Sequence, residues 1–262
     1  MITAGVDLAS QALHTAACVI EWSGGQAAVT NLALDVQDSA IAELISRASK
    51  VGIDVPFGWP IAFADAVSQH SRDGLWPLDY RHADNSTYRY RRTDLAVWKM
   101  LKTSPPLSVS SDRIAIPAMR AAALLSRLPE RAPLDGSGVI VEVYPAAALR
   151  RWEFAWRGYK RSANSQSRQL LVESLLREAG DWLIIDEAGV SRCLSSDDAF
   201  DALVAALVAR ATAVDLVEEI PADEHPAALR EGWIAVPQVG SFPLLPVERP
   251  TSDEKGTLLQ DS

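Results

Sequence analysis

The chain of 262 residues contains little cysteine and little histidine. Its two cysteines, Cys18 and Cys193, lie far apart in the sequence and suggest no redox pair. We therefore expect reduced thiols and a cytosolic protein. The four histidines are His14, His70, His82 and His225. Because they are scattered, the sequence argues against a zinc site.

The chain also lacks long apolar runs and several signatures of well-known enzymes. No stretch approaches ~18 consecutive apolar residues, so we expect no transmembrane helix. The first residues, MITAGVDLAS, contain no basic segment and predict a strand rather than a signal peptide. The motifs Gly-x-Ser-x-Gly, P-loop and Gly-x-Gly-x-x-Gly are absent from the sequence. Their absence argues against a serine hydrolase of that type and against the common nucleotide-binding folds.

Positive charge is scarce overall but concentrated in two places. The net charge of −9 argues against strong, nonspecific binding to nucleic acid. Residues 81–102 and 150–168 nevertheless hold 12 of the 25 lysines and arginines, and aromatic residues are interleaved with them. Two interpretations stay open. Either the stretches are solvated helix faces along which the arginine side chains lie, or they form a phosphate-binding rim whose aromatic rings provide stacking platforms.

Apolar periodicity predicts a mixed α/β fold. The predicted strands span residues 2–9, 13–23, 27–34, 50–56 and 139–145, with a further short strand or extended segment at 231–237. The predicted helices span residues 38–49, 117–128, 165–180 and 195–211. The first three strands form an antiparallel meander, and the fourth follows a helix and lies parallel to the first. We expect one domain over 1–249 with a helical insertion at about 57–137, and a disordered tail at 250–262.

Acidic residues interrupt three predicted strands and the start of an apolar helix. They are Asp7 in GVDLA, Asp54 in GIDVP, Glu142 in VEVYP, and Asp198 and Asp201 in DDAFDALVAA. Carboxylates that converge without basic partners in the same segments repel one another, and a divalent cation removes that repulsion. Mg²⁺ and Mn²⁺ prefer oxygen ligands. Two such ions can stabilise the attacking and leaving oxygens of a phosphodiester.

The segment 195–211 predicts a helix that is apolar on almost every side and therefore buried. Ser195 and Asp198 fit a capping box, which leaves Asp198 open between a cap and a functional role. Asp201 lies about a turn and a half into the helix, where no cap needs it. An unpaired buried carboxylate costs several kcal/mol. Asp201 therefore needs an arginine, a hydrogen-bond cluster or a metal.

In order along the chain, these motifs resemble a known family. The matching segments are GVDLA, GIDVPFGWP, RRTD at 91–94, VEVYP, the lysine of GYK at position 160, DDAFDALVAA and EGWIAVP, between residues 5 and 237. The chain resembles domain-of-unknown-function family 429, described as predicted nucleases with the ribonuclease H-like fold. The resemblance implies a mixed sheet of three antiparallel and then parallel strands with a helical insertion. It also implies a Mg²⁺- or Mn²⁺-dependent hydrolase of phosphodiester bonds, acting on nucleic acid or a nucleotide.

The resemblance also assigns roles to particular residues. It implies that Asp7, Asp54 and Asp201 hold metal, with Asp198 or Glu142 as a fourth ligand or base. Glu142 departs from the standard ligand positions of the wider superfamily, and pairing with Arg92 or Lys160 is the alternative. We expect Arg92 and Lys160 to contact phosphate, although an internal ion pair between Arg92 and Asp94 is equally consistent with the sequence.

Two other classes of function remain open. GVDLAS resembles the first phosphate loop of the actin-like fold, which would make the chain an ATP-dependent phosphotransferase. That fold normally needs two similar halves and Gly-rich adenosine loops, and this sequence shows one clear half. The second class is a non-catalytic module that uses the basic and aromatic stretches to bind nucleic acid or a protein. The retained acids argue against it, because without metal they only reduce stability.

Overall fold

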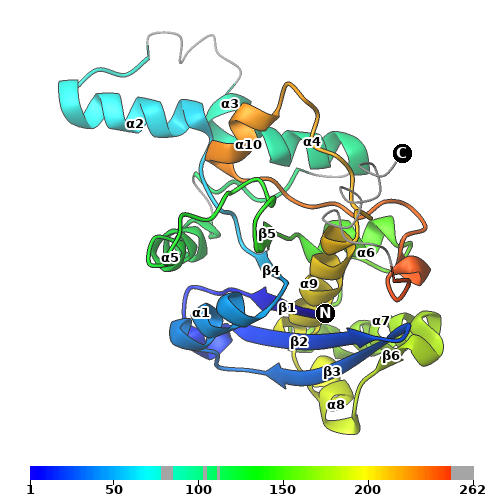
Figure 1. Ribbon diagram of the computed structural model, residues 1–262. Helices are drawn as coiled ribbons and strands as arrows, with labels where there is room; N and C mark the ends of the chain where they lie inside the picture. Colours follow the sequence, from blue (N-terminus) through cyan, green and yellow to red (C-terminus); the bar gives the residue numbers. More distant parts are fainter. Residues whose placement is uncertain (78–84, 103–104, 111–112, 249–262) are drawn as a thin grey trace, which may run out of the picture.

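The computed structural model describes residues 1–77, 85–102, 105–110 and 113–248, shown in Figure 1. In this part of the chain a six-stranded mixed sheet is covered by helices on both faces. No helix among these residues is long and apolar enough to cross a membrane. The tail expected to be disordered, residues 250–262, lies outside the described residues.

The sheet combines antiparallel and parallel strands. Its strands are β1 (Ile2–Asp7), β2 (Ala16–Ser23), β3 (Gln26–Ala33), β4 (Lys50–Asp54), β5 (Ile140–Glu142) and β6 (Leu183–Ile184). They lie in the order β5-β4-β1-β2-β3-β6. The predicted meander β1-β2-β3 is confirmed, as is the parallel pairing of β4 with β1. β5 is parallel to β4, and β6 is parallel to β3.

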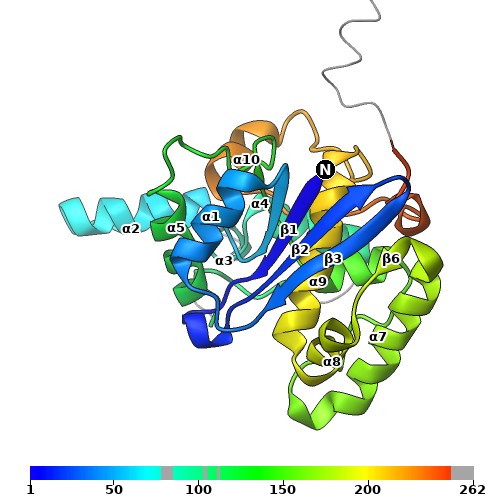
Figure 2. The same ribbon diagram turned by 60° about the horizontal axis from the view of Figure 1, so that its bottom comes forward.

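Helices cover both faces of this sheet. They are α1 (Asp38–Arg47), α2 (Ile61–Asp73), α3 (Ser86–Arg89), α4 (Arg92–Leu101), α5 (Ala115–Leu125), α6 (Pro145–Arg151), α7 (Ser165–Ala179), α8 (Glu187–Ser195), α9 (Asp197–Ala213) and α10 (His225–Glu231). α1 and α5 pack on one face, and α9 packs on the other (Figure 2). α6, α7 and α8 contribute to the same core as α9, so α9 is buried on all sides.

α9 approaches the sheet with backbone almost touching backbone. A Cβ atom at Gly5 of β1 would lie 2.1 Å from the carbonyl oxygen of Ala202, and one at Gly52 of β4 would lie 2.4 Å from that of Ala205. A real Cβ atom cannot lie this close to a backbone oxygen, so both positions require glycine. The alanines of α9 supply the other half of this close fit.

The expected helix 195–211 is confirmed as α9, which begins two residues later than predicted. α8 ends at Ser195, and α9 begins at Asp197 after an extended residue, Ser196. The predicted cap was therefore displaced by one residue, because the Ser196 side chain, not that of Ser195, accepts from the backbone N–H of Ala199 at 3.2 Å. Serine at this position satisfies an N–H group that has no partner within the helix.

Other elements also differ from the sequence predictions, in their bounds or in not being predicted. β2 begins at Ala16 rather than at residue 13, because a 3-10 turn occupies Ala12–His14. β6 was not predicted, since two residues carry no periodicity. Residues 231–237, predicted as a short strand or an extended segment, are extended after Glu231, the last residue of α10, with isolated bridges from Ile234 to Glu142 and from Pro237 to Val217.

Candidate metal centre

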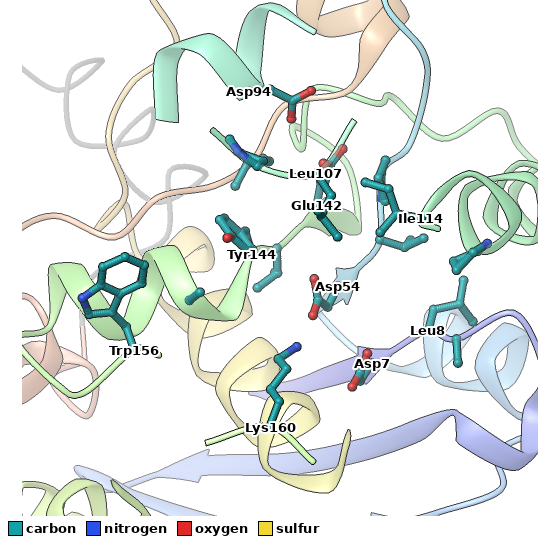
Figure 3. Close-up of a pocket in the computed structure, with 18 of the residues that line it drawn as sticks. Asp7, Leu8, Asp54, Asp94, Leu107, Ile114, Glu142, Tyr144, Trp156 and Lys160 are labelled. Carbon is teal, nitrogen blue, oxygen red and sulfur yellow. The ribbon is translucent and has the colours of Figure 1, made fainter. Parts of the chain in front are cut away.

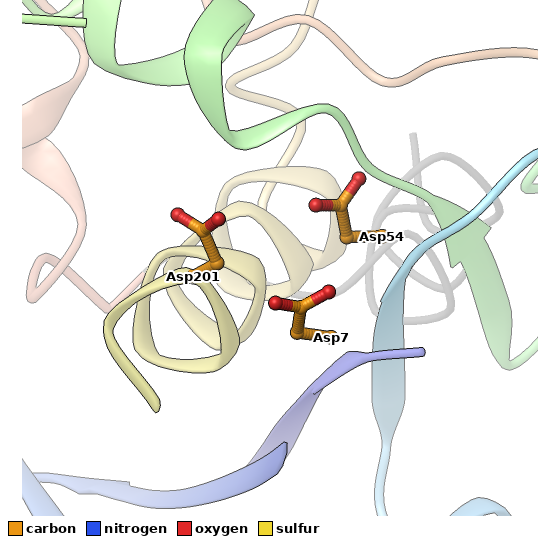
Figure 4. A group of neighbouring side chains, drawn as sticks. All are labelled: Asp7, Asp54 and Asp201. Atoms are coloured by element: carbon orange, nitrogen blue, oxygen red, sulfur yellow. The ribbon is translucent and has the colours of Figure 1, made fainter. Parts of the chain in front are cut away.

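Three of the predicted acidic residues lie together at one edge of the sheet. Asp7 is the last residue of β1, Asp54 is the last residue of β4, and Asp201 lies in α9. One carboxylate oxygen from each lies within 4.8 Å of the other two. Figure 4 shows the three carboxylates facing one another. The convergence expected from the sequence is therefore present for these three residues.

The motif Gly-x-Asp, present in both strands, explains this convergence. Gly5 and Asp7 are two residues apart on β1, and Gly52 and Asp54 are two apart on β4. Residues two apart on a strand face the same side, and the parallel register pairs Gly5 with Gly52 and Asp7 with Asp54. The glycines admit the backbone of α9, and the aspartates point along the same face toward Asp201.

Burial and mutual repulsion disfavour the charged forms of the clustered carboxylates. Burial raises the pKa of Asp7 well above its ordinary value, and the charges of Asp54 and Asp201 raise it further. Burial also raises the pKa of Asp54 to about 7, even though Lys160 lowers it. Both shifts have the direction expected for carboxylates that share one poorly solvated site. The arrangement favours a bound cation or a bound proton.

Lys160 and Tyr159 enclose Asp201. The Tyr159 hydroxyl donates to Asp201 Oδ1 at 2.8 Å, and Lys160 Nζ lies 2.6 Å from Oδ2 as an ion pair. Oδ2 accepts no hydrogen bond from the described residues beside this ion pair. The charge of Asp201 raises the pKa of Lys160 well above its ordinary value. Asp201 is thus buried and paired to a lysine, not to the arginine considered from the sequence.

Glu142 belongs to a different arrangement, beside the cluster. Arg91 donates to both carboxylate oxygens of Glu142 at 2.7 Å, and to Asp94 at 2.9 and 3.1 Å. The backbone N–H of Phe57 also donates to Glu142 at 3.0 Å. The partner of Glu142 is therefore Arg91, and the expectation of Arg92 or Lys160 was wrong. The sequence did not distinguish neighbouring arginines, of which Arg91 points inward and is 2% exposed.

Of the remaining two predicted residues, Asp198 lies near the three carboxylates, since its charge helps to raise the pKa of Asp7, and Arg92 does not. Arg92 forms an ion pair at 2.5 Å with Glu224, the residue before α10, so the alternative pairing with Asp94 was also wrong. Arg92 is not among the described residues that line the cavity. Asp198 is partly buried in the first turn of α9, one turn before Asp201. Burial and the charge of Asp197 raise the pKa of Asp198.

A cavity of about 490 Å³ opens onto the carboxylates (Figure 3). Asp7, Asp54 and Lys160 form the charged end of this cavity. Asp201, which contacts Lys160, does not line it. The remaining wall is largely apolar and includes Leu8, Pro106, Leu107, Ile114, Pro117 and Val143. The volume lies within the range of ordinary small-ligand sites.

A basic and aromatic group lies at the same cavity, as one of the sequence interpretations required. Trp156 and Arg157 both line it. The Arg157 guanidinium lies 3.9 Å from the centre of the Trp156 ring, and that of Arg150 lies 5.0 Å from it. These residues belong to the stretch 150–168, whose basic and aromatic character was noted from the sequence without singling them out. Tyr159 and Arg91 were not predicted as members of the site.

The fold and the cluster define a mixed α/β protein with an acidic centre at the ends of two parallel strands. A family model described as "Protein of unknown function (DUF429)" matches residues 5–226, and the chain belongs to this family. The family recognised in the sequence is therefore confirmed. No curated protein and no solved structure matches the chain significantly.

Proposed function

We propose that this protein is a divalent-metal-dependent hydrolase of phosphodiester bonds, built on a ribonuclease H-like fold. The observation that carries the proposal is the convergence of Asp7, Asp54 and Asp201 within 4.8 Å of one another, with Asp7 and Asp54 lining a cavity. The strand order, with a meander followed by parallel strands, supports the fold assignment.

The donor set fits a hard divalent cation. All three groups are carboxylates, which Mg²⁺ and Mn²⁺ prefer as ligands. Asp201 Oδ2 is buried and receives no hydrogen bond from the described residues. Of the cations nearby, only Lys160 has an ion pair with one of the three aspartates in the described part of the chain. Asp7, Asp54 and Asp201 would hold the metal, which supplies Lewis acidity and a bound water of lowered pKa.

The surrounding residues have separate tasks in this proposal. Tyr159 donates to Asp201 Oδ1 and so fixes the orientation of that carboxylate. Arg157 and Lys160 border the cavity and supply positive charge for a phosphate group. The apolar wall excludes water from the far side of the substrate. Without metal, Asp54, whose pKa is about 7, can hold a proton near neutral pH, and a bound cation would displace that proton.

A thermal-shift titration with Mn²⁺ and Mg²⁺ tests the metal site. A ligand at about 100 times its Kd stabilises a protein by ~2.7 kcal/mol, which for a domain of this size is about 5–10 °C. We expect this shift in the wild type and in the control Asp181→Asn, which changes an exposed aspartate. We expect no shift in Asp7→Asn. A wild type that does not respond to millimolar metal would contradict the proposal.

Hydrolysis is then measured with bis(p-nitrophenyl) phosphate and with single-stranded and duplex DNA and RNA. The proposal expects cleavage that requires metal and is lost in Asp7→Asn. Metal binding without cleavage of any diester would refute the hydrolase. That result would favour the phosphotransferase or the non-catalytic binding module instead.

A further inference from the structure

We propose that Lys160 is a displaceable internal cation: it takes the place of metal at Asp201 and leaves for the cavity when a divalent ion binds. This inference rests on the proposed metal site and concerns its regulation. The observation behind it is that Asp201 does not line the cavity, whereas Lys160, which lies against it, does. The three carboxylates already converge, so a metal ion that binds all of them from the cavity would compete with Lys160 for Asp201.

The two side chains of the Lys160–Asp201 ion pair differ greatly in solvent exposure. The Asp201 side chain is 1% exposed, and the Lys160 side chain is 51% exposed. The ammonium thus reaches from water into a buried pocket, and its stem remains at the surface. Asp201 Oδ2 has the Lys160 ammonium beside it as an ion pair and accepts no hydrogen bond from the described residues. A metal ion would occupy the same coordination direction, and a cation of charge two would outcompete a cation of charge one.

The backbone at Lys160 is fixed, so the movement is confined to the side chain. Arg168, which is 1% exposed, donates to the carbonyl oxygens of Tyr159 at 3.0 Å and of Arg161 at 3.2 Å. Asn164 donates to the carbonyl oxygen of Lys160 at 2.7 Å. Arg161 keeps a φ of 74°, a conformation that costs energy in a residue with a side chain and persists only where surrounding contacts enforce it.

A lysine side chain is long and flexible, so the Lys160 ammonium can adopt positions away from Asp201 once a metal replaces its charge there. The four-carbon stem can move the ammonium from Asp201 to the cavity without any change in the backbone. Lys160 and Arg157 both line the cavity already, so an ammonium released from Asp201 stays beside Arg157, where an anionic substrate oxygen would be bound. Metal binding and the exposure of a phosphate-binding cation are thereby one event.

Two measurements on the same proteins test this inference. The first is the Kd for Mn²⁺, from calorimetry, of the wild type, Lys160→Ala and the control Lys99→Ala, which removes an exposed lysine of α4. We expect Lys160→Ala to bind Mn²⁺ about tenfold more tightly than the wild type, equivalent to ~1.4 kcal/mol. We expect the control to match the wild type.

The second measurement is the rate at which acetic anhydride acetylates each lysine, followed by mass spectrometry with and without Mn²⁺. It uses the wild-type protein, so it does not depend on the folding of a variant. Lys160 is expected to be acetylated several times faster with Mn²⁺, and Lys99 equally fast in both conditions. In Asp201→Asn, Lys160 is expected to react fast without metal.

The outcomes separate this inference from the proposed function. Mn²⁺ binding by the wild type, with unchanged acetylation of Lys160 and an unchanged Kd in Lys160→Ala, would overturn the inference alone. Failure of both the wild type and Lys160→Ala to bind Mn²⁺ would overturn the metal site and the inference together.

Discussion

Replacing Asp54 by asparagine should stabilise the metal-free protein at pH 8 and have little effect at pH 4. The pKa of this carboxyl is raised from 3.8 to about 7, mainly by burial. A carboxyl with a raised pKa in the folded state stabilises the protein below its unfolded pKa, and this contribution is lost as the pH rises through the folded pKa. The relevant window is therefore pH 4 to pH 7. Asparagine has nearly the same shape and carries no charge in that window.

The size of the effect follows from the same two values. The interval from 3.8 to about 7, at ~1.4 kcal/mol for each pH unit, gives at most about 4 kcal/mol. Asp54 is partly exposed to the cavity, so water there screens its charge and the measured gain should be smaller. Urea unfolding with EDTA at pH 4, 6 and 8 measures it for the wild type and Asp54→Asn. The exposed control Asp181→Asn should change stability by less than ~0.5 kcal/mol at each pH.

An Asp54→Asn protein that is less stable than the wild type at pH 8 would refute this reasoning. It would mean that the Asp54 carboxylate is stabilised by its neighbours and is not a charge held at a cost. An equal gain at pH 4 and pH 8 would also refute it, because the gain would then not come from the charge.

Three further predictions concern the residues that build the site. Arg91→Met leaves two buried carboxylates without their cation, so we expect the free energy of unfolding to fall by about 3–5 kcal/mol in urea denaturation; a loss below ~1 kcal/mol would contradict this. Gly5→Ala places Cβ 2.1 Å from the Ala202 carbonyl oxygen, and circular dichroism should show a loss above ~3 kcal/mol or no folded protein. A native-like melting curve would contradict this, because α9 would then be able to shift away from β1 and accommodate the Cβ atom. Ser196→Ala removes the cap of α9 and should cost about 1 kcal/mol in thermal unfolding, whereas Ser195→Ala should cost less.

The sequence predicted those parts of the site that local pattern controls. Asp7 and Asp54 interrupt apolar strands, and a parallel arrangement of those strands brings their ends together. Asp201 lies on a helix with no polar face, so burial followed from its neighbours. These three residues needed no knowledge of distant contacts beyond the order of the elements.

The parts that were missed depend on contacts between distant segments. Arg91 and Arg92 are adjacent, and only the packing of α4 decides that Arg91 reaches Glu142 while Arg92 reaches Glu224. The pairing of Lys160 with Asp201 depends on a loop with no regular pattern. The two glycines before the aspartates were a signal that was available, since Gly-x-Asp occurs in both strands at equal register.

The close contact between α9 and the first strands has a consequence for synthesis and folding. The carboxylate cluster joins residue 7 to residue 201, and the Thr3 hydroxyl also donates to the Ala206 carbonyl oxygen at 3.1 Å. Contacts of such long sequence separation form late, because the loop between them must close first. A nascent chain that has not yet released residue 201 from the ribosome therefore has two facing aspartates and no complete site. The proposed metal site is therefore complete only when almost the whole polypeptide has folded.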